Sequence, residues 1–231
     1  MGANPNPLAV IVGAGSGLSA SLARKCAAAG MRVVLAARNT EKLASLSREI
    51  DAKAVACDVA DAAQVERLFA GLDAPELVVY NPSYRVRGAF LGLDREEVKK
   101  TLMVCAYGGF LVAQAAAKRM LERGRGSLFF TGASASVKGY AESAPFAMGK
   151  FALRGLAQSL ARELGPKNIH VAHFVIDGGI EKPGGDARAA ARGDDGMLQP
   201  DAIADTYMQV YRQHRSAWTF EVDLRPWVEK F

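Results

Sequence analysis

The sequence predicts an α/β protein built on a doubly wound sheet of seven mainly parallel strands, with helices on both faces. Three observations predict this class. Strand-length apolar runs alternate with helix-period segments, the first six runs are apolar at consecutive positions, and a glycine-rich turn follows the first run. Consecutive apolar residues are typical of strands buried on both faces, and the alternation favours right-handed crossovers. Half of the 231 residues are hydrophobic, and we interpret residues 1–231 as a single domain.

The predicted elements follow one another in regular order. The strands are the runs Leu8–Val12, Arg32–Ala36, Ala54–Cys57, Leu77–Tyr80, Ser127–Thr131, His170–Ile176 and Ala217–Val222. The helices are the segments Gly17–Gly30, Thr40–Ile50, Ala62–Gly71, Arg95–Arg123, Ala144–Leu164 and Pro200–His214. Asp61 and Asp94 stand where side-chain N-caps are expected, and Gly165-Pro166 is expected to end the fifth helix.

Two segments show no strong period. Residues 1–7 are polar and rich in Pro and Asn, so we expect a flexible start without the features of a signal peptide. Residues 178–196 are rich in Gly, Asp and Arg, which favours a mobile substrate lid. No stretch approaches the length of a membrane span, so no membrane association is expected.

Charge and cysteine content disfavour several function classes. The formal charge of +5 comes from basic residues scattered among acids, so no nucleic-acid partner is expected. The one basic cluster, within residues 118–125, falls at the end of a predicted helix, where cations complement the helix dipole. Cys26, Cys57 and Cys105 lie in apolar contexts without metal-ligand spacing. We therefore expect no metal site, a reducing compartment and a cytoplasmic location.

A glycine-rich turn joins the first predicted strand to the first predicted helix. Glycines allow a tight turn and let backbone N–H groups approach a diphosphate, which also meets the positive end of the helix dipole. The position between strand and helix makes this a cofactor-binding prediction, with a simple connecting turn as the alternative. The residues predicted to bind are Gly13, Gly15, Ser16, Gly17 and Leu18.

The end of the second strand indicates which dinucleotide is bound. A carboxylate there would bond the adenosine ribose of NAD, whereas Arg38 offers a guanidinium suited to a 2′-phosphate. Ala37 leaves no acidic competitor, so NADP(H) is favoured over NAD(H). The alternative is that Arg38 is a solvated residue at a strand end. Asp58 is expected either at the adenine edge or in a turn.

These features together resemble the short-chain dehydrogenase/reductase family over nearly the whole chain. The resemblance rests on the glycine turn and on Arg38–Leu43, Cys57–Val59, Tyr80–Ser83, Gly108, Lys150–Leu153, Ala161–Leu164 and Ile169–Val171. It implies a Rossmann-type sheet, an NAD(P) cofactor, and a homodimer or homotetramer formed through the two longest helices. Carried over by position, it also implies cofactor contacts from Val59, Asn81, Lys150 and Gly178.

The departures from the family fall on the residues that carry its chemistry. The family's active-site Tyr lies four residues before the Lys, on the same helix face, and counting back from Lys150 gives Phe146. The family's Ser falls on Ala133, with Ser134 one position along, and its helix Asn falls on Cys105. This pattern resembles a divergent branch of the family that lacks the active-site Tyr.

Loss of the Tyr removes the family's proton donor. Reduction of a carbonyl leaves an alkoxide that must be protonated or stabilised as it forms, and loss of a general acid costs about two to four orders of magnitude in rate. Lys150 is expected to bind the nicotinamide ribose, with a surface lysine as the alternative. Four side chains are candidate donors, each with a packing or loop role as the alternative: Ser134, Tyr84, Tyr107 and Tyr140.

Two hypotheses follow. The retained cofactor residues favour an NADP(H)-dependent oxidoreductase that acts on an unknown carbonyl or alcohol substrate through a nonstandard proton donor, with Lys150 and Ser134 as catalytic candidates. The combined changes at Ala133, Phe146 and Cys105 favour instead a catalytically silent NADP(H)-binding scaffold or sensor. The C-terminal run Arg215–Trp227 is expected either at a dimer interface or closing its own core.

Overall fold

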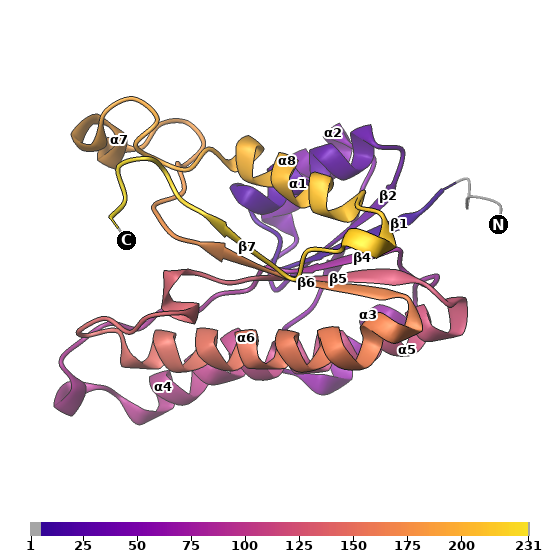
Figure 1. Cartoon of the computed structure of the whole chain (residues 1–231), viewed down its shortest axis with the longest axis horizontal. Coiled ribbons are helices and arrows are strands. Elements are labelled where there is room, and N and C mark those ends of the chain that lie inside the picture. Colours follow the sequence, from indigo (N-terminus) through magenta and orange to yellow (C-terminus); the bar gives the residue numbers. More distant parts are fainter. Residues whose placement is uncertain (1–5, 231) are drawn as a thin grey trace.

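Seven strands form one parallel sheet in the order β3-β2-β1-β4-β5-β6-β7 (Figure 1). The structure, a computed structural model, describes residues 6–230. Every neighbouring pair of strands runs parallel, so the predicted doubly wound sheet is confirmed. The strands are β1 (Leu8–Val12), β2 (Arg32–Ala37), β3 (Lys53–Ala56), β4 (Leu77–Tyr80), β5 (Gly126–Thr131), β6 (Ile169–Ile176) and β7 (Glu221–Leu224).

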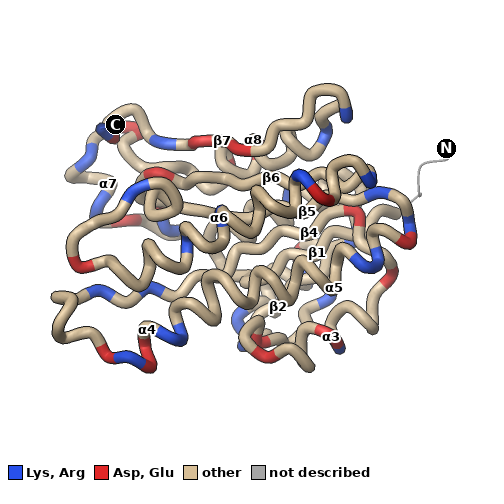
Figure 2. Tube along the Cα trace, turned by 60° about the horizontal axis from the view of Figure 1, so that its bottom comes forward, with Lys and Arg blue, Asp and Glu red and all other residues tan. Residues whose placement is uncertain are grey.

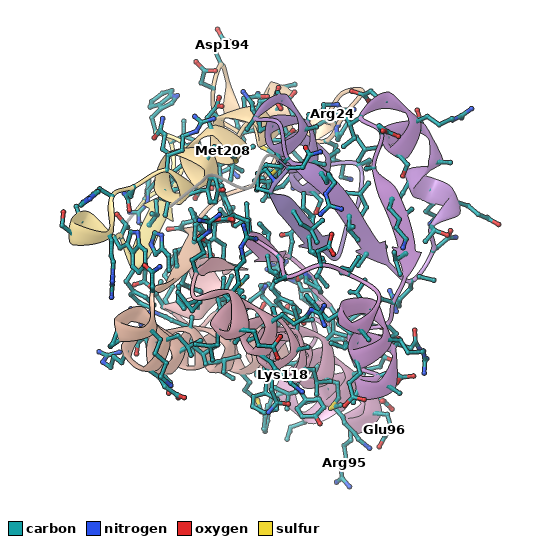
Figure 3. All side chains as sticks on the ribbon, turned by 90° about the vertical axis from the view of Figure 1, so that its right-hand side faces the viewer. Arg24, Arg95, Glu96, Lys118, Asp194 and Met208 are labelled. Carbon is teal, nitrogen blue, oxygen red and sulfur yellow. The ribbon has the colours of Figure 1, made fainter. Side chains whose placement is uncertain are left out.

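Helices cover both faces of this sheet. Their bounds are α1 (Leu18–Ala28), α2 (Ala44–Glu49), α3 (Ala62–Ala70), α4 (Arg95–Leu102), α5 (Gly108–Arg123), α6 (Ala144–Leu164), α7 (Ala187–Arg192) and α8 (Pro200–Tyr211). In Figure 1, α1, α2 and α8 lie above the sheet and α3 to α6 lie below it. Alternate residues of a strand face opposite layers, so Val10 packs with the lower layer and Ile11 with the upper one. Figure 3 shows the two layers from the side, with Arg24 and Met208 in one and Lys118 in the other.

The predicted helix boundary signals are confirmed at three helix ends. Asp61 accepts a 3.1 Å hydrogen bond from the backbone N–H of Gln64, which caps α3. Asp94 accepts from two backbone N–H groups and caps α4. Because Pro166 cannot continue the hydrogen-bond ladder, α6 ends at Leu164 and a 3-10 turn follows.

The last strand begins later than predicted. It spans Glu221–Leu224 rather than Ala217–Val222, and residues 215–217 form a 3-10 turn. The Trp218 ring stacks on His170 at 4.6 Å between centroids, and the carbonyl oxygen of Thr219 bonds His170 Nε2 at 2.9 Å. These contacts hold the chain outside the strand ladder until Glu221. The segment 178–196 also differs from a plain loop, because it contains α7.

The helix predicted over Arg95–Arg123 is continuous but not uniform. Residues Met103–Tyr107 form a π turn between α4 and α5. By length and composition alone, this run of 29 residues contains a stretch long and apolar enough to cross a membrane, which corrects the expectation that no stretch approaches that length. Its apolar side is occupied in the fold, because Val112, Ala116 and Met120 are buried against the sheet. The helix is thus a core helix of the domain.

Charged residues of both signs are interspersed over the surface (Figure 2). In the one predicted basic cluster, Arg119 donates to the carbonyl oxygen of Leu72, and Arg123 donates to that of Ala74 at 3.0 Å. Arg123 and Arg125 also form ion pairs with Glu76. These arginines connect the end of α5 to the segment that leads into β4, which gives them a structural role.

Candidate functional site

A cleft of about 520 Å³ opens at the carboxyl ends of β1, β2, β3 and β4. In doubly wound sheets, ligands bind in the crevice at these strand ends. The cleft reaches past the strand ends to Tyr84 and Val104. The predicted cofactor residues that line it are Gly13, Gly15, Ser16, Arg38, Asp58, Val59 and Asn81.

The glycine turn has the shape that close approach of a ligand requires. Gly13 has a φ of +77°, and a Cβ there would lie 2.6 Å from the nitrogen of Pro82, so only glycine fits. At Gly15 and Gly17, a Cβ would meet no atom within 4 Å. The backbone at these two positions therefore borders open space at the N-terminus of α1. A diphosphate fits this arrangement, because it would meet backbone N–H groups and the positive helix end.

Ser19 fixes the base of the turn, at the position where the resembled family has its third glycine. Its hydroxyl donates to the carbonyl oxygen of Gly13 at 3.2 Å, and Asn81 Nδ2 donates to the same hydroxyl at 2.7 Å. The backbone N–H of Asn81 bonds the carbonyl oxygen of Val12 at 2.9 Å. Ser19 thus connects the turn after β1 to the end of β4. In this structure, Asn81 and Ser19 hold the turn together.

Two cations line the cleft next to the end of β2. Arg38 and Lys42 are exposed, line the cleft, and form no ion pair or hydrogen bond within residues 6–230. Asn39 accepts a 2.9 Å bond from the N–H of Glu41, which fixes the start of the 3-10 turn that carries Lys42. Lys42 was not predicted from the sequence, although it lies only four residues after Arg38. The pair gives this end of the cleft the charge that suits a phosphate.

Asp58 lies in the turn that follows β3. One carboxylate oxygen accepts a 3.0 Å hydrogen bond from the backbone N–H of Ala60, and the Asp58 N–H donates to Gln64 Oε1 at 2.9 Å. Asp58 is therefore a turn residue, and it also lines the cleft. Val59 beside it is buried where Gly108 of α5 crosses, since a Cβ at Gly108 would lie 2.9 Å from Val59 Cγ2.

Lys150 is buried on α6, with only 2% of its surface exposed, so it is not a surface lysine. Its amine donates a 2.9 Å hydrogen bond to the carbonyl oxygen of Thr131 at the end of β5. Burial holds the pKa of this amine below its ordinary value. The amine also lies 5.8 Å from the centroid of the Phe146 ring, one helical turn earlier on α6. The predicted pairing of positions 146 and 150 on one helix face is thus present.

The three positions that depart from the family form one apolar cluster. Cys105, Ala135 and Phe146 are buried together, with Ala133 packed against them. Cys105 lies in the π turn, against Gly149 of α6, where a Cβ would be 2.7 Å from Cys105 Cβ. These positions therefore meet in space as the spacing predicts, but among them only the Cys105 thiol is polar. The cluster has no oxygen that can protonate an alkoxide.

The candidate proton donors do not lie together. Ser134 opens the 3-10 turn Ser134–Ser136 and is half-buried. The hydroxyl of Tyr84 donates to Glu97, and the Tyr107 ring stacks on Phe110 with centroids 6.1 Å apart. Tyr140 is 43% exposed, and the amine of Lys138 lies 5.8 Å from its ring centroid. Of these four, Tyr84 lines the cleft, and Tyr140 has a lysine beside it.

A group of three polar side chains around the buried His173 was not recognised from the sequence. His173 Nδ1 bonds Glu221 Oε2 at 2.9 Å, and both carboxylate oxygens of Glu221 accept bonds of 2.7 Å from Arg154 of α6. Burial lowers the pKa of His173 to about 4, and its Nε2 has no hydrogen-bond partner within residues 6–230. This network gives His173 a structural role, because it joins β6 to β7 and α6. The signal in the sequence was weak, because Arg154 and Glu221 lie far apart along the chain.

Part of the proposed lid borders the glycine turn, because Glu181–Gly185 line a second pocket together with Gly15 and Ser16. A Cβ at Gly178 would be 2.6 Å from Pro226 Cδ, and Gly178 does not line the cleft described above. Asp177 before it pairs with Lys138 at 3.5 Å. Within residues 6–230, no group of three or more His, Cys, Asp or Glu side chains is placed to hold a metal ion.

Comparisons with known proteins agree with this geometry. The family model for the short chain dehydrogenases matches residues 7–183. Carbonyl reductase (NADPH) 2 from Sus scrofa is 32% identical over 165 residues, and L-xylulose reductase from Bos taurus is 31% identical over 165 residues. Each match covers 71% of this chain and 68% of the relative.

Solved structures match almost the whole chain. A short-chain dehydrogenase from Rhodopseudomonas palustris shares 35% identity with a TM-score of 0.84, covering 97% of this chain and 100% of that chain. A metagenomic short-chain oxidoreductase, solved in complex with NADP, shares 28% identity with a TM-score of 0.83, covering 96% and 98%. With this fold, this cleft and these relatives, the chain belongs to the short-chain dehydrogenase/reductase family.

Proposed function

We propose that the protein is an NADP(H)-dependent oxidoreductase that acts on a carbonyl or alcohol substrate through a nonstandard proton donor. The observation that carries the proposal is the cleft, in which an open glycine turn faces Arg38 and Lys42 with no carboxylate at the end of β2. The glycine turn would hold the diphosphate, and the two cations would hold the 2′-phosphate. The NADP-bound relative and the pig carbonyl reductase support this cofactor.

When bound, the cofactor would supply or accept the hydride. The chain must then provide a proton, and Phe146 has none to give. Among the candidate donors we propose Tyr140, because its side chain is exposed and the amine of Lys138 lies 5.8 Å from its ring centroid. The pKa of Lys138 is raised, in the first place by Tyr140 and further by Asp177, as expected for an interacting pair. Lys150 would bind the nicotinamide ribose, while Ser134 stays a candidate for contact with the substrate oxygen.

Thermal unfolding with NADP⁺ and with NAD⁺ tests the cofactor. A ligand at about a hundred times its dissociation constant stabilises a fold by about 2.7 kcal/mol, and we expect this effect from NADP⁺. Replacing both cations, Arg38→Ala with Lys42→Ala, should remove the preference for NADP⁺, whereas Arg48→Ala on α2 should not. Stronger stabilisation by NAD⁺ in the wild-type protein would contradict the assignment.

Turnover of a panel of carbonyl compounds and alcohols tests the donor. We expect Tyr140→Phe to lower kcat by about two to four orders of magnitude, as for loss of a general acid. Tyr107→Phe is the matched control, since that phenol stacks on Phe110. Equal loss in both variants, or no loss in Tyr140→Phe, would overturn the assignment of Tyr140.

A second function is favoured by the apolar cluster of Ala133, Cys105 and Phe146. In that case the protein is a catalytically silent NADP(H)-binding scaffold or sensor. Restoring the family residues, Phe146→Tyr with Ala133→Ser, should then leave NADP⁺ affinity unchanged and introduce turnover that the wild-type protein lacks. Turnover by the wild-type protein at ordinary enzyme rates would rule out the silent scaffold.

We also propose a homodimer or homotetramer in a reducing, cytoplasmic compartment. Large apolar side chains of the π turn, α5 and α6 are 42–51% exposed: Tyr107, Phe110, Met148 and Phe151. Such a patch fits an interface between copies. Sedimentation of the wild-type protein and of Phe110→Glu with Phe151→Glu tests this, with dissociation expected in the double variant. A wild-type monomer would contradict it.

A further inference from the structure

Arg85 stands between the cofactor cleft and the position of the family's active-site Tyr. It lies in the segment after β4, directly after Tyr84, which lines the cleft. Its guanidinium carbon lies 5.0 Å from the centroid of the Phe146 ring. Since ligands of this fold bind at the carboxyl ends of the strands, Arg85 is placed beside the expected reaction centre.

The segment that carries Arg85 is held at both ends. The backbone N–H of Tyr84 donates to Cys105 Sγ at 3.4 Å, and the thiol donates to the carbonyl oxygen of Tyr84 at 3.4 Å. The N–H of Gly88 donates to the carbonyl oxygen of Glu142 at 3.1 Å. The backbone that carries Arg85 is thus fixed, and its guanidinium lies over the Phe146 ring. Arg85 therefore loses little conformational freedom when it binds a ligand.

Arg85 has no anionic partner among the residues that the structure describes. Within residues 6–230, neither Arg85 nor its neighbour Arg87 forms an ion pair or a side-chain hydrogen bond. Two other cations beyond the carboxyl ends of the strands are paired, Lys138 with Asp177 and Arg192 with Glu229.

The surroundings of Arg85 disfavour an isolated charge. Burial and the nearby Arg87 hold the pKa of Arg85 below its ordinary value. The Tyr84 hydroxyl already engages Glu97, which also pairs with Lys100 at 3.6 Å. An anionic ligand would supply the counterion that this guanidinium lacks among residues 6–230. Arg85 is nevertheless exposed, so a ligand can reach it.

We propose that Arg85 binds a carboxylate or phosphate group of the substrate, with Arg87 adding to the positive field, so that the protein acts on negatively charged carbonyl compounds or alcohols. The proposal rests on the proposed function for its reaction, but the binding of the anion does not depend on turnover. A planar guanidinium suits either group, because it bonds two oxygens at once.

Binding of paired probes to the full-length protein tests the proposal. The probes are small 2-oxo carboxylates, their methyl esters, and phosphate monoesters of short carbonyl compounds, titrated by calorimetry with and without NADP⁺. We expect one of the two anionic classes to bind about tenfold or more tightly than the neutral esters, in line with a charge-assisted pair. The class that binds more tightly identifies the group as carboxylate or phosphate.

Variants test whether Arg85 causes the tighter binding of anionic probes. Arg85→Met keeps the apolar stem on the Phe146 ring and removes the charge, and it should abolish the preference for anions. Arg95→Ala is the matched control, because Arg95 on α4 points into solvent, away from the sheet (Figure 3). It should retain the preference. Melting curves confirm that each variant is folded, and Arg85→Lys should retain part of the effect.

The outcomes separate this proposal from the proposed function. Equal binding of anions and esters, or equal loss in the Arg85 and Arg95 variants, would overturn the anion site. Failure of NADP⁺ to bind, together with anion binding that depends on Arg85, would instead overturn the cofactor assignment and leave the anion site in place.

Discussion

The amine of Lys150 donates a 2.9 Å hydrogen bond to the carbonyl oxygen of Thr131, which connects α6 to the end of β5. The amine is buried, and burial lowers its pKa. In the unfolded chain the same amine titrates near the ordinary lysine value of about 10.4. Between the two pKa values the unfolded state binds more protons, so this group makes the protein more stable as the pH rises through that window.

Lys150→Met removes this dependence. We expect the free energy of unfolding of the wild-type protein, minus that of the variant, to increase from neutral to alkaline pH. Other groups titrate in this range too, and the subtraction cancels them. Urea denaturation of both proteins at several pH values measures this difference in the free energy of unfolding. A difference that does not change with pH would show that the buried amine is not desolvated as described.

His173 makes the protein sensitive to acid. Its pKa is lowered from 6.5 to about 4 because burial disfavours the imidazolium, even beside Glu221. Between pH 6.5 and 4 the unfolded chain binds this proton and the folded protein does not. As the pH is lowered from 6.5 to 4, the free energy of unfolding should therefore fall by up to about 3 kcal/mol. His173→Asn should show a shallower fall by denaturation at a series of pH values. His214→Asn, at an exposed histidine, should behave as the wild-type protein does.

Cys105 holds the segment that carries Arg85. Cys105→Ala removes both bonds to the backbone of Tyr84, so we expect a loss of about 1 to 3 kcal/mol in stability. Amide hydrogen exchange at Tyr84 should be faster in that variant, and Cys105→Ser should restore part of the protection. Cys57→Ala, at a buried thiol elsewhere, should leave exchange at Tyr84 unchanged. Unchanged exchange in Cys105→Ala would contradict the tether.

Gly108 lets α5 cross close to the sheet. A Cβ there would lie 2.6 Å from the Tyr80 hydroxyl and 2.9 Å from the carbonyl oxygen of Val59, so Gly108→Ala should cost about 1 to 3 kcal/mol. Gly155→Ala on α6 is the control, because a Cβ there meets nothing within 4 Å. It should stabilise the protein by up to about 1 kcal/mol. Thermal melts of both variants check the contrast.

Much of the fold could be predicted from the sequence, because it depends on local patterns. Buried parallel strands have consecutive apolar residues, and Asp61 and Asp94 mark helix starts by chemistry within one turn. The start of β7 could not be predicted, because it depends on the stacking of the Trp218 ring on His170 in another strand. The π turn also escaped prediction, because its residues have an ordinary helical pattern.

The site divides in the same way. The glycine turn and Arg38 could be predicted, because each directly follows a strand that the sequence pattern identifies. The four-residue spacing of Phe146 and Lys150 also predicts that they share one helix face. The position of Arg85 depends on contacts from Cys105 and Glu142, which lie far from it in the sequence. Lys42 was missed because a lysine on a short helical turn is common on any surface.

The three-way contact of Arg154, His173 and Glu221 has a consequence for biosynthesis. Glu221 follows His173 by 48 residues and Arg154 by 67, so both of its partners are synthesised well before it. Until Glu221 has been made, Arg154 of α6 and His173 of β6 therefore lack their acidic partner. A chain cut short before β7, by early termination or by proteolysis, would expose one edge of the sheet and be a substrate for quality control.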